Sequence, residues 1–299
     1  MTVATVTLNP AVDQTLRVDR ALAPDEVIRV DEAQFDPGGK GINVSQYLDA
    51  MGTETVASGV LGGFLGEFVA DELAAAGIET AFVHVAGTTR MNSTVHAAAE
   101  EYKLNQRGPQ VSTADVDAIV ERLRGVAPST VVVAGSLPPG LDSDAIDRLA
   151  RAGPWETVVD VEGALLRELD AEYAWCKPNV PELAAATGRD GDGVDDPVDA
   201  ARQLRADGFD GVIASLGADG AVLVSGDGVV HEPAIETEVV DTVGAGDALL
   251  SGVLAALEAG ASHDAALHTG VVAATAVVST HGTTVPSLPD PTDSGVESV

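Results

Sequence analysis

The chain has 299 residues, with 16 Lys and Arg against 47 Asp and Glu, so its formal charge at pH 7 is −31. Such a surface repels nucleic acid and anionic lipid, which both need a basic footprint, and the single cysteine excludes an internal disulfide framework. The hydrophobic content of 45 % argues against disorder, and neither a signal peptide nor an apolar run of roughly 18 residues is found, so we expect one cytoplasmic domain with no membrane partner.

Lysine is strongly depleted, because only Lys40, Lys103 and Lys177 stand among the 16 cationic residues. At ordinary ionic strength the excess of like charge would destabilise the compact state. Molar salt shortens the Debye length to about 3 Å and largely removes that cost. We therefore hypothesise a halophilic protein that works at very high salt, with an ordinary acidic enzyme as the alternative.

Apolar, β-branched runs alternate with amphipathic stretches along the chain. Several of the runs are continuously apolar, as strands buried on both faces are. The predicted strands are residues 3–8, 55–59, 82–85, 131–134, 157–161, 212–215 and 221–224. The predicted helices are residues 64–76, 114–124, 143–152, 197–207, 245–259 and 265–279. This alternation predicts an α/β fold with a mostly parallel sheet and helices on both faces.

Two stretches depart from this alternation. Residues 15–35 and 92–107 look like short alternating strands with polar loops, so they predict a small separate sheet. A half-exposed sheet of that kind suits a lid or a dimer contact. No linker is long enough to divide residues 1–299, and residues 287–299, rich in acids and proline, predict a loose tail.

The segment DTVGAGD, residues 241–247, leads into an apolar helix. Gly244, Ala245 and Gly246 allow a tight turn, so successive N–H groups can point the same way at the helix N-terminus and bind an anion. Asp247 is placed to accept a proton from a hydroxyl nucleophile while the amides hold the charge on a transferring phosphoryl group. The alternative is a glycine-rich strand–helix turn with Asp247 as an ordinary helix acid.

A second glycine-rich segment, PGGKGINV at residues 37–44, also stands ahead of a helix. Gly38 and Gly39 permit close backbone approach to a ligand, Lys40 supplies a cation, and Asn43 can hydrogen-bond hydroxyls. The segment is not a P-loop, because GxxxxGK[ST] is absent. A flexible turn is the alternative, although a chain that avoids lysine is expected to place one where a compact charge is needed.

Three weaker segments complete the pattern. In KPNVPE, residues 177–182, Asn179 and Glu182 could orient hydrated Mg²⁺, or they could form a helix capping pair. Residues 215–220, SLGADG, predict a hairpin-like turn. Residues 134–140, AGSLPPG, form a loop at the carboxyl end of a strand, where open α/β sheets bind their ligands.

In this order, the segments from about residue 3 to 282 resemble the PfkB (ribokinase-like) family of carbohydrate kinases. GGKGINVS and DTVGAGD match the two signatures of the family. The resemblance is greatest to the branch that phosphorylates hexose phosphates, namely 1-phosphofructokinases and tagatose-6-phosphate kinases, and it is carried by TLNPAVD at 7–13, Lys40, Arg90 with Asn92, and AGSLPPG at 134–140. It implies a three-layer α/β/α sandwich, a β-sheet lid that forms a homodimer interface in many members, and ATP with Mg²⁺.

The resemblance also implies a role for each motif residue. Asp247 would be the general base, and Gly244, Ala245 and Gly246 the anion hole. Sugar hydroxyls would be held by Asp13, Gly38, Gly39, Asn43 and Ser136, and the phosphate already on the substrate by Lys40, Arg90 and Asn92. ATP would contact Lys177, Asn179, Ser215, Gly217 and Gly220, and Mg²⁺ would be supported through water by Asn179 and Glu182. Asp241 resembles the monovalent-cation site of ribokinase-type members, which implies K⁺, whereas the hexose-phosphate branch often has Ser there.

We therefore expect an ATP-dependent kinase of a ketohexose phosphate, converting fructose 1-phosphate to fructose 1,6-bisphosphate, because Lys40 and Arg90 suit a substrate that already bears a phosphate. The alternatives are a 6-phosphofructokinase or tagatose-6-phosphate kinase, then a kinase of unphosphorylated sugars or nucleosides. A non-catalytic sugar-phosphate sensor could lack the base or the anion hole, and both are present. A dinucleotide oxidoreductase needs GxGxxG after the first strand, where LNPA stands.

Overall fold

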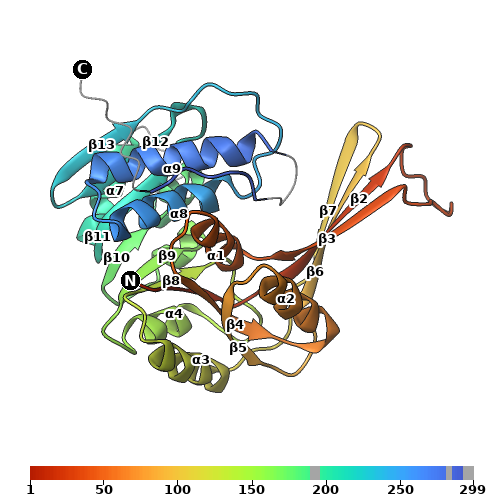
Figure 1. Ribbon diagram of the computed structural model, residues 1–299, viewed down its shortest axis with the longest axis horizontal. Coiled ribbons are helices and arrows are strands. Elements are labelled where there is room, and N and C mark those ends of the chain that lie inside the picture. The colour runs from red at the N-terminus through yellow and green to blue at the C-terminus, as the bar shows by residue number, and fades with distance from the viewer. Residues whose placement is uncertain (189–195, 281–284, 292–299) are drawn as a thin grey trace.

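The strands of the computed structural model, which describes residues 1–188, 196–280 and 285–291, form two separate sheets (Figure 1). Sheet A contains, in spatial order, β13 (Gly228–Glu232), β12 (Ala221–Ser225), β11 (Phe209–Ser215), β10 (Tyr173–Cys176), β9 (Glu156–Asp160), β8 (Thr130–Ala134), β1 (Val3–Thr7), β4 (Thr55–Leu61) and β5 (Glu79–His84). Sheet B contains β3 (Glu32–Gly38), β2 (Ala11–Val18), β6 (Arg90–Ala97) and β7 (Glu100–Asn105).

Sheet A is parallel from β11 across to β5, and β12 and β13 add an antiparallel edge. The mostly parallel sheet predicted from the continuous apolar runs is therefore confirmed. The β11–β12 hairpin also confirms the turn predicted at residues 215–220. The strands of sheet A that the sequence did not predict are short: β10 has only four residues, and β13 lies at the edge and is largely exposed.

The helices are α1 (Lys40–Ala50), α2 (Gly63–Ala75), α3 (Thr113–Val126), α4 (Ser143–Ala150), α5 (Gly163–Leu166), α6 (Val180–Ala186), α7 (Pro197–Ala206), α8 (Ala245–Glu258) and α9 (His263–Val278). Several begin where the sequence supplies a cap. Ser112 and Asp115 form a capping box on α3, and the carboxylate of Asp196 accepts two backbone N–H groups of α7. Such caps satisfy amides that have no partner inside the helix.

The helices cover sheet A on both faces, which gives three layers (Figure 1). Because side chains alternate along a strand, Val132 belongs to the core on the face covered by α1, α8 and α9, while its neighbours Val131 and Val133 belong to the core on the face covered by α3, α4, α6 and α7. A smaller core beneath α2 joins β4 and β5 to Val12 of sheet B and Ile42 of α1. The predicted layer arrangement is thus confirmed.

Sheet B projects from the body of the molecule (Figure 1). Its central strand β2 pairs antiparallel with β3 and parallel with β6. The separate small sheet predicted from residues 15–35 and 92–107 is confirmed, but its strands begin earlier, at Ala11 and Arg90. The earlier start matters, because the bases of β2 and β6 bring Asp13 and Asn92 to the body of the protein.

The carboxyl end of sheet A is where the predicted site residues gather. From β1 the chain continues to β4 and β5 on one side, whereas β8, β9 and β10 extend the sheet on the other. A ligand crevice is expected at such a reversal of strand order. Ser136, Asp160 and Lys177 lie at or just after the ends of β8, β9 and β10.

The C-terminal part of the chain continues after α9 without helix or strand over residues 285–291. Leu288 packs against the core formed by α8 and α9. The rest of the predicted tail, residues 292–299, lies outside the described residues. Within the described residues, every helix is too short or too polar to cross a membrane.

Candidate active site

The turn before α8 is tight and leaves backbone N–H groups unpaired at the N-terminus of the helix. Gly244 adopts φ 79° as the N-cap, and a Cβ at this position would lie 2.5 Å from Tyr47 Oη, so only glycine fits. The N–H of Ala245 donates to Thr242 O at 3.4 Å. The N–H groups of Gly244, Gly246 and Asp247 make no hydrogen bond within the described part of the chain, so they are free to bind an anion.

Asp247 lies in the first turn of α8 and is buried. Its Oδ2 accepts a hydrogen bond from Asn43 Nδ2 at 2.8 Å. Burial, and next the nearby carboxylate of Asp160, raise the pKa of Asp247 to about 6, against the opposing influence of Lys40, Asn43 and Lys177. The carboxylate is therefore ionised at neutral pH and is a stronger base than an exposed aspartate.

The activity should reflect this titration. We expect kcat/KM to fall as the pH drops through about 6, because protonation of Asp247 removes the base; at higher pH the base is fully available. The measurement is a pH profile of kcat/KM at constant ionic strength. Enzyme held at the lowest pH should regain full activity on return to neutral pH. An acid limb near the ordinary aspartate pKa of about 4 would contradict the prediction.

Asp160, which the sequence analysis did not identify, stands beside both lysines of the predicted site. Its side chain is fully buried, Oδ1 lies 2.7 Å from Lys40 Nζ, and Oδ2 lies 3.2 Å from Lys177 Nζ. An acidic residue that ends a continuously apolar strand is unusual, because buried carboxylates are rare unless paired. That pattern in TVVD was the available signal.

Lys40 itself is the first residue of α1, so the predicted GGKGINV segment does not stand wholly ahead of the helix. The motif instead forms the cap and the first turns. Gly39, with φ 119°, is the N-cap. The helical placement directs Asn43 to Asp247 rather than into an open loop. Its predicted contact with sugar hydroxyls stays a prediction, as does that of Gly39.

Asp13 and Asn92 are register partners on β2 and β6, and Asn92 Nδ2 donates to Asp13 Oδ1 at 2.9 Å. A Cβ on Gly38 would lie 2.2 Å from Asp13 Oδ2, so the glycine makes room for this carboxylate. Burial raises the pKa of Asp13, although Asn92 and Arg90 lower it. The pair forms a polar wall at the junction of the two sheets.

Arg90 begins β6 beside this wall. It donates from Nε to Asn9 O at 3.2 Å and from Nη1 to Gln106 O at 3.3 Å, and it forms no ion pair within the described residues. Its charge therefore remains available to an anionic ligand.

Asn9, which the sequence analysis also missed, links Arg90 to the predicted Ser136. Asn9 Nδ2 donates to Ser136 Oγ at 3.1 Å. The Oδ1 atoms of Asn9 and Asn92 are buried without a hydrogen-bond partner in the described structure. Buried polar atoms are normally satisfied, so these two oxygens leave hydrogen-bonding capacity unused beside Arg90 and Asp13.

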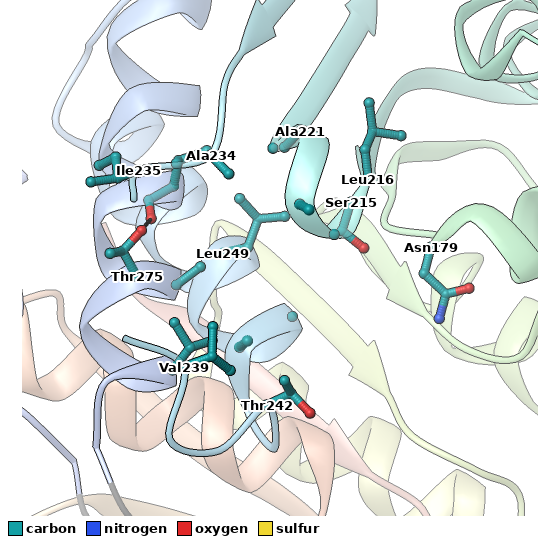
Figure 2. A pocket seen from close by; sticks show the side chains of 18 of the residues that line it. Asn179, Ser215, Leu216, Ala221, Ala234, Ile235, Val239, Thr242, Leu249 and Thr275 are labelled. Atoms are coloured by element: carbon teal, nitrogen blue, oxygen red, sulfur yellow. Dashed lines mark hydrogen bonds between the residues drawn. The ribbon is translucent and has the colours of Figure 1, made fainter. Parts of the chain in front are cut away.

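A cavity of about 810 Å³ lies on the other side of the α8 turn (Figure 2). Ser215, Gly217 and Gly220, whose contacts with ATP stay a prediction, line it together with Asn179 and the turn residues Ala245 and Gly246. Lys177 does not line it, because its side chain is buried against Asp160. In Figure 2, Leu249 lies between Ser215 on one side and Ile235 and Thr275 on the other.

The residues predicted to support metal ions have local structural roles. Asn179 and Glu182 form the capping box of α6: Glu182 Oε2 accepts from Asn179 N, and Asn179 Oδ1 accepts from Glu182 N. Asp241 Oδ1 accepts from Val243 N at 3.0 Å. No cluster of three or more His, Cys, Asp or Glu residues able to hold a metal ion occurs in the described part of the chain.

Comparisons with known proteins show which family the chain belongs to. The model of the pfkB family carbohydrate kinases matches residues 6–291. The chain is 54 % identical over 288 residues to a 1-phosphofructokinase of Haloferax volcanii, covering 96 % of this chain and 94 % of the relative. It is 33 % identical over 280 residues to a 1-phosphofructokinase of Bacillus subtilis, covering 91 % of each.

A solved structure of similar fold is that of phosphofructokinase-2 from Escherichia coli in complex with potassium. The TM-score is 0.88 at 28 % identity, and the match covers 97 % of this chain and 96 % of that one. The predicted ribokinase-like fold and kinase activity are confirmed, and kinases of this family use ATP with a metal ion. The chain belongs to the pfkB family of carbohydrate kinases.

Proposed function

We propose that this kinase transfers the γ-phosphoryl group of ATP to a hydroxyl of fructose 1-phosphate and so produces fructose 1,6-bisphosphate. The observation that carries the proposal is the position of Asp247, a buried base near the ammonium of Lys40. Arg90, whose charge is unpaired within the described residues, lies on the sugar side as a second cation. Two relatives described as 1-phosphofructokinases support the same substrate.

The chain's own residues suffice for a direct transfer without a phosphoenzyme. Asp247 removes the proton from the attacking hydroxyl. The free amides of the α8 turn and the ammonium of Lys177, which lies beside Gly246, hold the charge on the migrating phosphoryl group. Lys40, Arg90 and Asn92 hold the phosphate already on the sugar, while Asp13 and Ser136 orient its hydroxyls.

Mg²⁺ fits the nucleotide side of the site. The capping box uses Glu182 Oε2, so Oε1 remains available to a water ligand of the ion, and Mg²⁺ prefers oxygen ligands and keeps several waters. Glu182 and Asn179 would hold these waters. The ion would neutralise charge on the phosphates of the nucleotide.

We propose Asp241 as part of a K⁺ site below the α8 turn. Its Oδ1 already organises the backbone of that turn, and the related phosphofructokinase-2 of Escherichia coli is described in complex with potassium. A bound cation would stabilise the conformation in which the amides point at the anion.

A coupled ADP assay with a panel of acceptors tests the proposed function. The panel contains fructose 1-phosphate, fructose 6-phosphate, tagatose 6-phosphate, fructose and a nucleoside, in K⁺ and in a non-binding cation at equal ionic strength. We expect fructose 1-phosphate to give the highest kcat/KM, with faster turnover in K⁺. A higher kcat/KM for another acceptor would identify that acceptor as the substrate instead of fructose 1-phosphate. If no acceptor is phosphorylated, the alternative of a non-catalytic sugar-phosphate sensor is favoured.

The nucleotide base should be recognised weakly. Its cavity is lined mainly by apolar side chains, such as Ala234, Val239 and Leu249, and the hydroxyl of Thr275 already donates to Val271 O (Figure 2). Sites that hydrogen-bond a group reject analogues lacking it by about 10⁴–10⁵, whereas apolar pockets discriminate by about 10–200. We expect kcat/KM for GTP to be within about 100-fold of that for ATP. A preference of about 10⁴ would contradict this.

The charge of −31 leads to a salt-dependent fold. We expect the far-UV CD signal and the activity to be lost on dialysis into low salt and to return in molar salt, because screening removes the repulsion among the acidic side chains. A neutral osmolyte at matched osmolarity is the control for crowding. Full folding and activity at low salt would overturn the halophilic interpretation.

We propose that sheet B forms a homodimer interface. Phe35, Tyr102 and Leu104 of this sheet are exposed apolar side chains, as is Val27 in the loop between β2 and β3. A related phosphofructokinase-2 of Escherichia coli is described in a tetrameric inhibited form. The mass in solution, compared with that of a Leu104→Glu variant, checks the proposal.

A cytoplasmic location stays a prediction.

A further inference from the structure

We propose that Asp160 is a positioning residue that fixes Lys40 and Lys177 relative to each other and to Asp247. This inference rests on the proposed function. Asp160 ends β9 at the centre of sheet A, and its two carboxylate oxygens face different lysines, at 2.7 Å and 3.2 Å. One carboxylate thereby joins a residue of the sugar side to a residue of the phosphoryl side.

The two lysines reach Asp160 from separate elements. Lys40 is the first residue of α1, and Lys177 follows β10. Lys177 Nζ lies 3.1 Å from the place that a Cβ on Gly246 would take, so this ammonium stands against the α8 turn. Asp160 therefore contacts both lysines and holds the start of α1 at a fixed separation from the turn before α8.

Burial makes this arrangement depend on the carboxylate. The side chain of Lys177 is only 4 % exposed and that of Asp160 is fully buried. Asp160 Oδ2 accepts no hydrogen bond within the described residues, so the ion pair with Lys177 is its polar contact there. Removing one member of a buried charge pair leaves the other uncompensated, so each lysine would move or lose order without Asp160.

The same carboxylate balances the charges around the base. Burial alone would lower the pKa of Lys40, but the carboxylate of Asp160, together with those of Asp247 and Glu182, holds that pKa above its ordinary value. For Asp247, burial and then Asp160 raise the pKa, whereas Lys40 and Lys177 lower it. Without Asp160, two uncompensated cations would make Asp247 a weaker base.

Asp160→Asn tests the inference, because it keeps the shape and removes the charge. We expect the KM values for both the sugar phosphate and ATP to rise about tenfold, as for loss of a charged hydrogen bond. We also expect the acid limb of kcat/KM to move to lower pH by about one unit, because a neighbouring negative charge is lost. A residue that only supports the fold would leave the acid limb in place.

Asp147→Asn is the matched control. Asp147 is also buried, accepts hydrogen bonds from Tyr173 Oη and from the N–H groups of Asp170 and Ala171, and pairs with Arg151. It belongs to α4 and contacts the amino end of β10, whereas the candidate site lies at the carboxyl ends of the strands of sheet A. This variant should lower Tm without moving the acid limb. If Asp160→Asn leaves either the acid limb or both KM values unchanged, the inference is wrong.

A measurement on the wild-type protein decides the matter if Asp160→Asn does not fold. Since the chain has only three lysines, ¹⁵N-lysine labelling gives three side-chain ammonium signals, and Lys103→Ala assigns the exposed one. At slightly acid pH and low temperature, the hydrogens of Lys40 and Lys177 should exchange more slowly than those of Lys103. Equally fast exchange of all three would overturn the inference. This result is independent of whether any sugar is phosphorylated.

Discussion

Asp247→Asn should fold normally and lose about 10²–10⁴-fold in kcat, the usual scale for removing a general base. Asn keeps the shape of the side chain and can still accept a hydrogen bond from Asn43, which now binds Asp247 Oδ2 at 2.8 Å. It cannot take the proton of the attacking hydroxyl. Steady-state turnover with fructose 1-phosphate and ATP at saturating concentrations, with CD and thermal unfolding in parallel, measures both effects.

The stability of this variant has a defined sign. The folded protein raises the pKa of Asp247 above its ordinary value of 3.8. Such a shift makes the charged form less favourable in the folded state, so it lowers the free energy of unfolding above pH about 6, and this effect is absent below the unfolded pKa. Asp247→Asn should therefore be at least as stable as the wild type at neutral pH. Near-wild-type turnover would overturn the assignment of the base.

Lys40→Ala should raise the KM for the sugar phosphate by about 10–100-fold, which corresponds to loss of a hydrogen bond to a charged group. The KM for ATP should change far less. Lys177 retains its ion pair with Asp160 in this variant and still stands beside the α8 turn. Initial rates with one substrate varied and the other saturating separate the two constants.

Lys103→Ala is the matched control for that experiment. Lys103 is the third lysine of the chain, lies on β7 of sheet B and pairs with Glu101 at 2.9 Å in an exposed position. The same substitution there should leave both KM values unchanged. If Lys40→Ala raises the KM for ATP as much as that for the sugar phosphate, Lys40 does not belong to the sugar side.

Much of the fold follows from local sequence because its signals are local. A run such as TVVVA at residues 130–134 is buried on both faces, and its nearly continuous apolar character is typical of a parallel strand. The elements that escaped prediction have weak local signals. β10 pairs with a strand on each side but has only four residues. The start of β2 is fixed by pairing with β6, in which Asn92 stands 79 positions from its partner Asp13.

The site was predictable where its chemistry depends on unusual residue types. Glycines beside Asp247 and a rare lysine at position 40 mark two segments by their composition alone. Asp160 carries only a weaker mark, an acidic residue at the end of an apolar strand, because its partner Lys40 is 120 positions away and the local sequence does not show that its charge is paired. Asn43 illustrates the same limit: its contact with a sugar hydroxyl stays a prediction, and its hydrogen bond to Asp247, 204 positions away, could not be predicted from the local sequence.

The distribution of the lysines has a practical consequence for handling the protein. Lys177 is enclosed, and Lys40 is held as an ammonium by Asp160, so neither offers the free amine that acylating reagents need. Lys103, on the projecting sheet, has the most exposed lysine side chain, at 56 % against 37 % for Lys40 and 4 % for Lys177. An N-hydroxysuccinimide dye or an amine-coupled sensor chip should therefore react with Lys103 in preference to the two lysines of the candidate site.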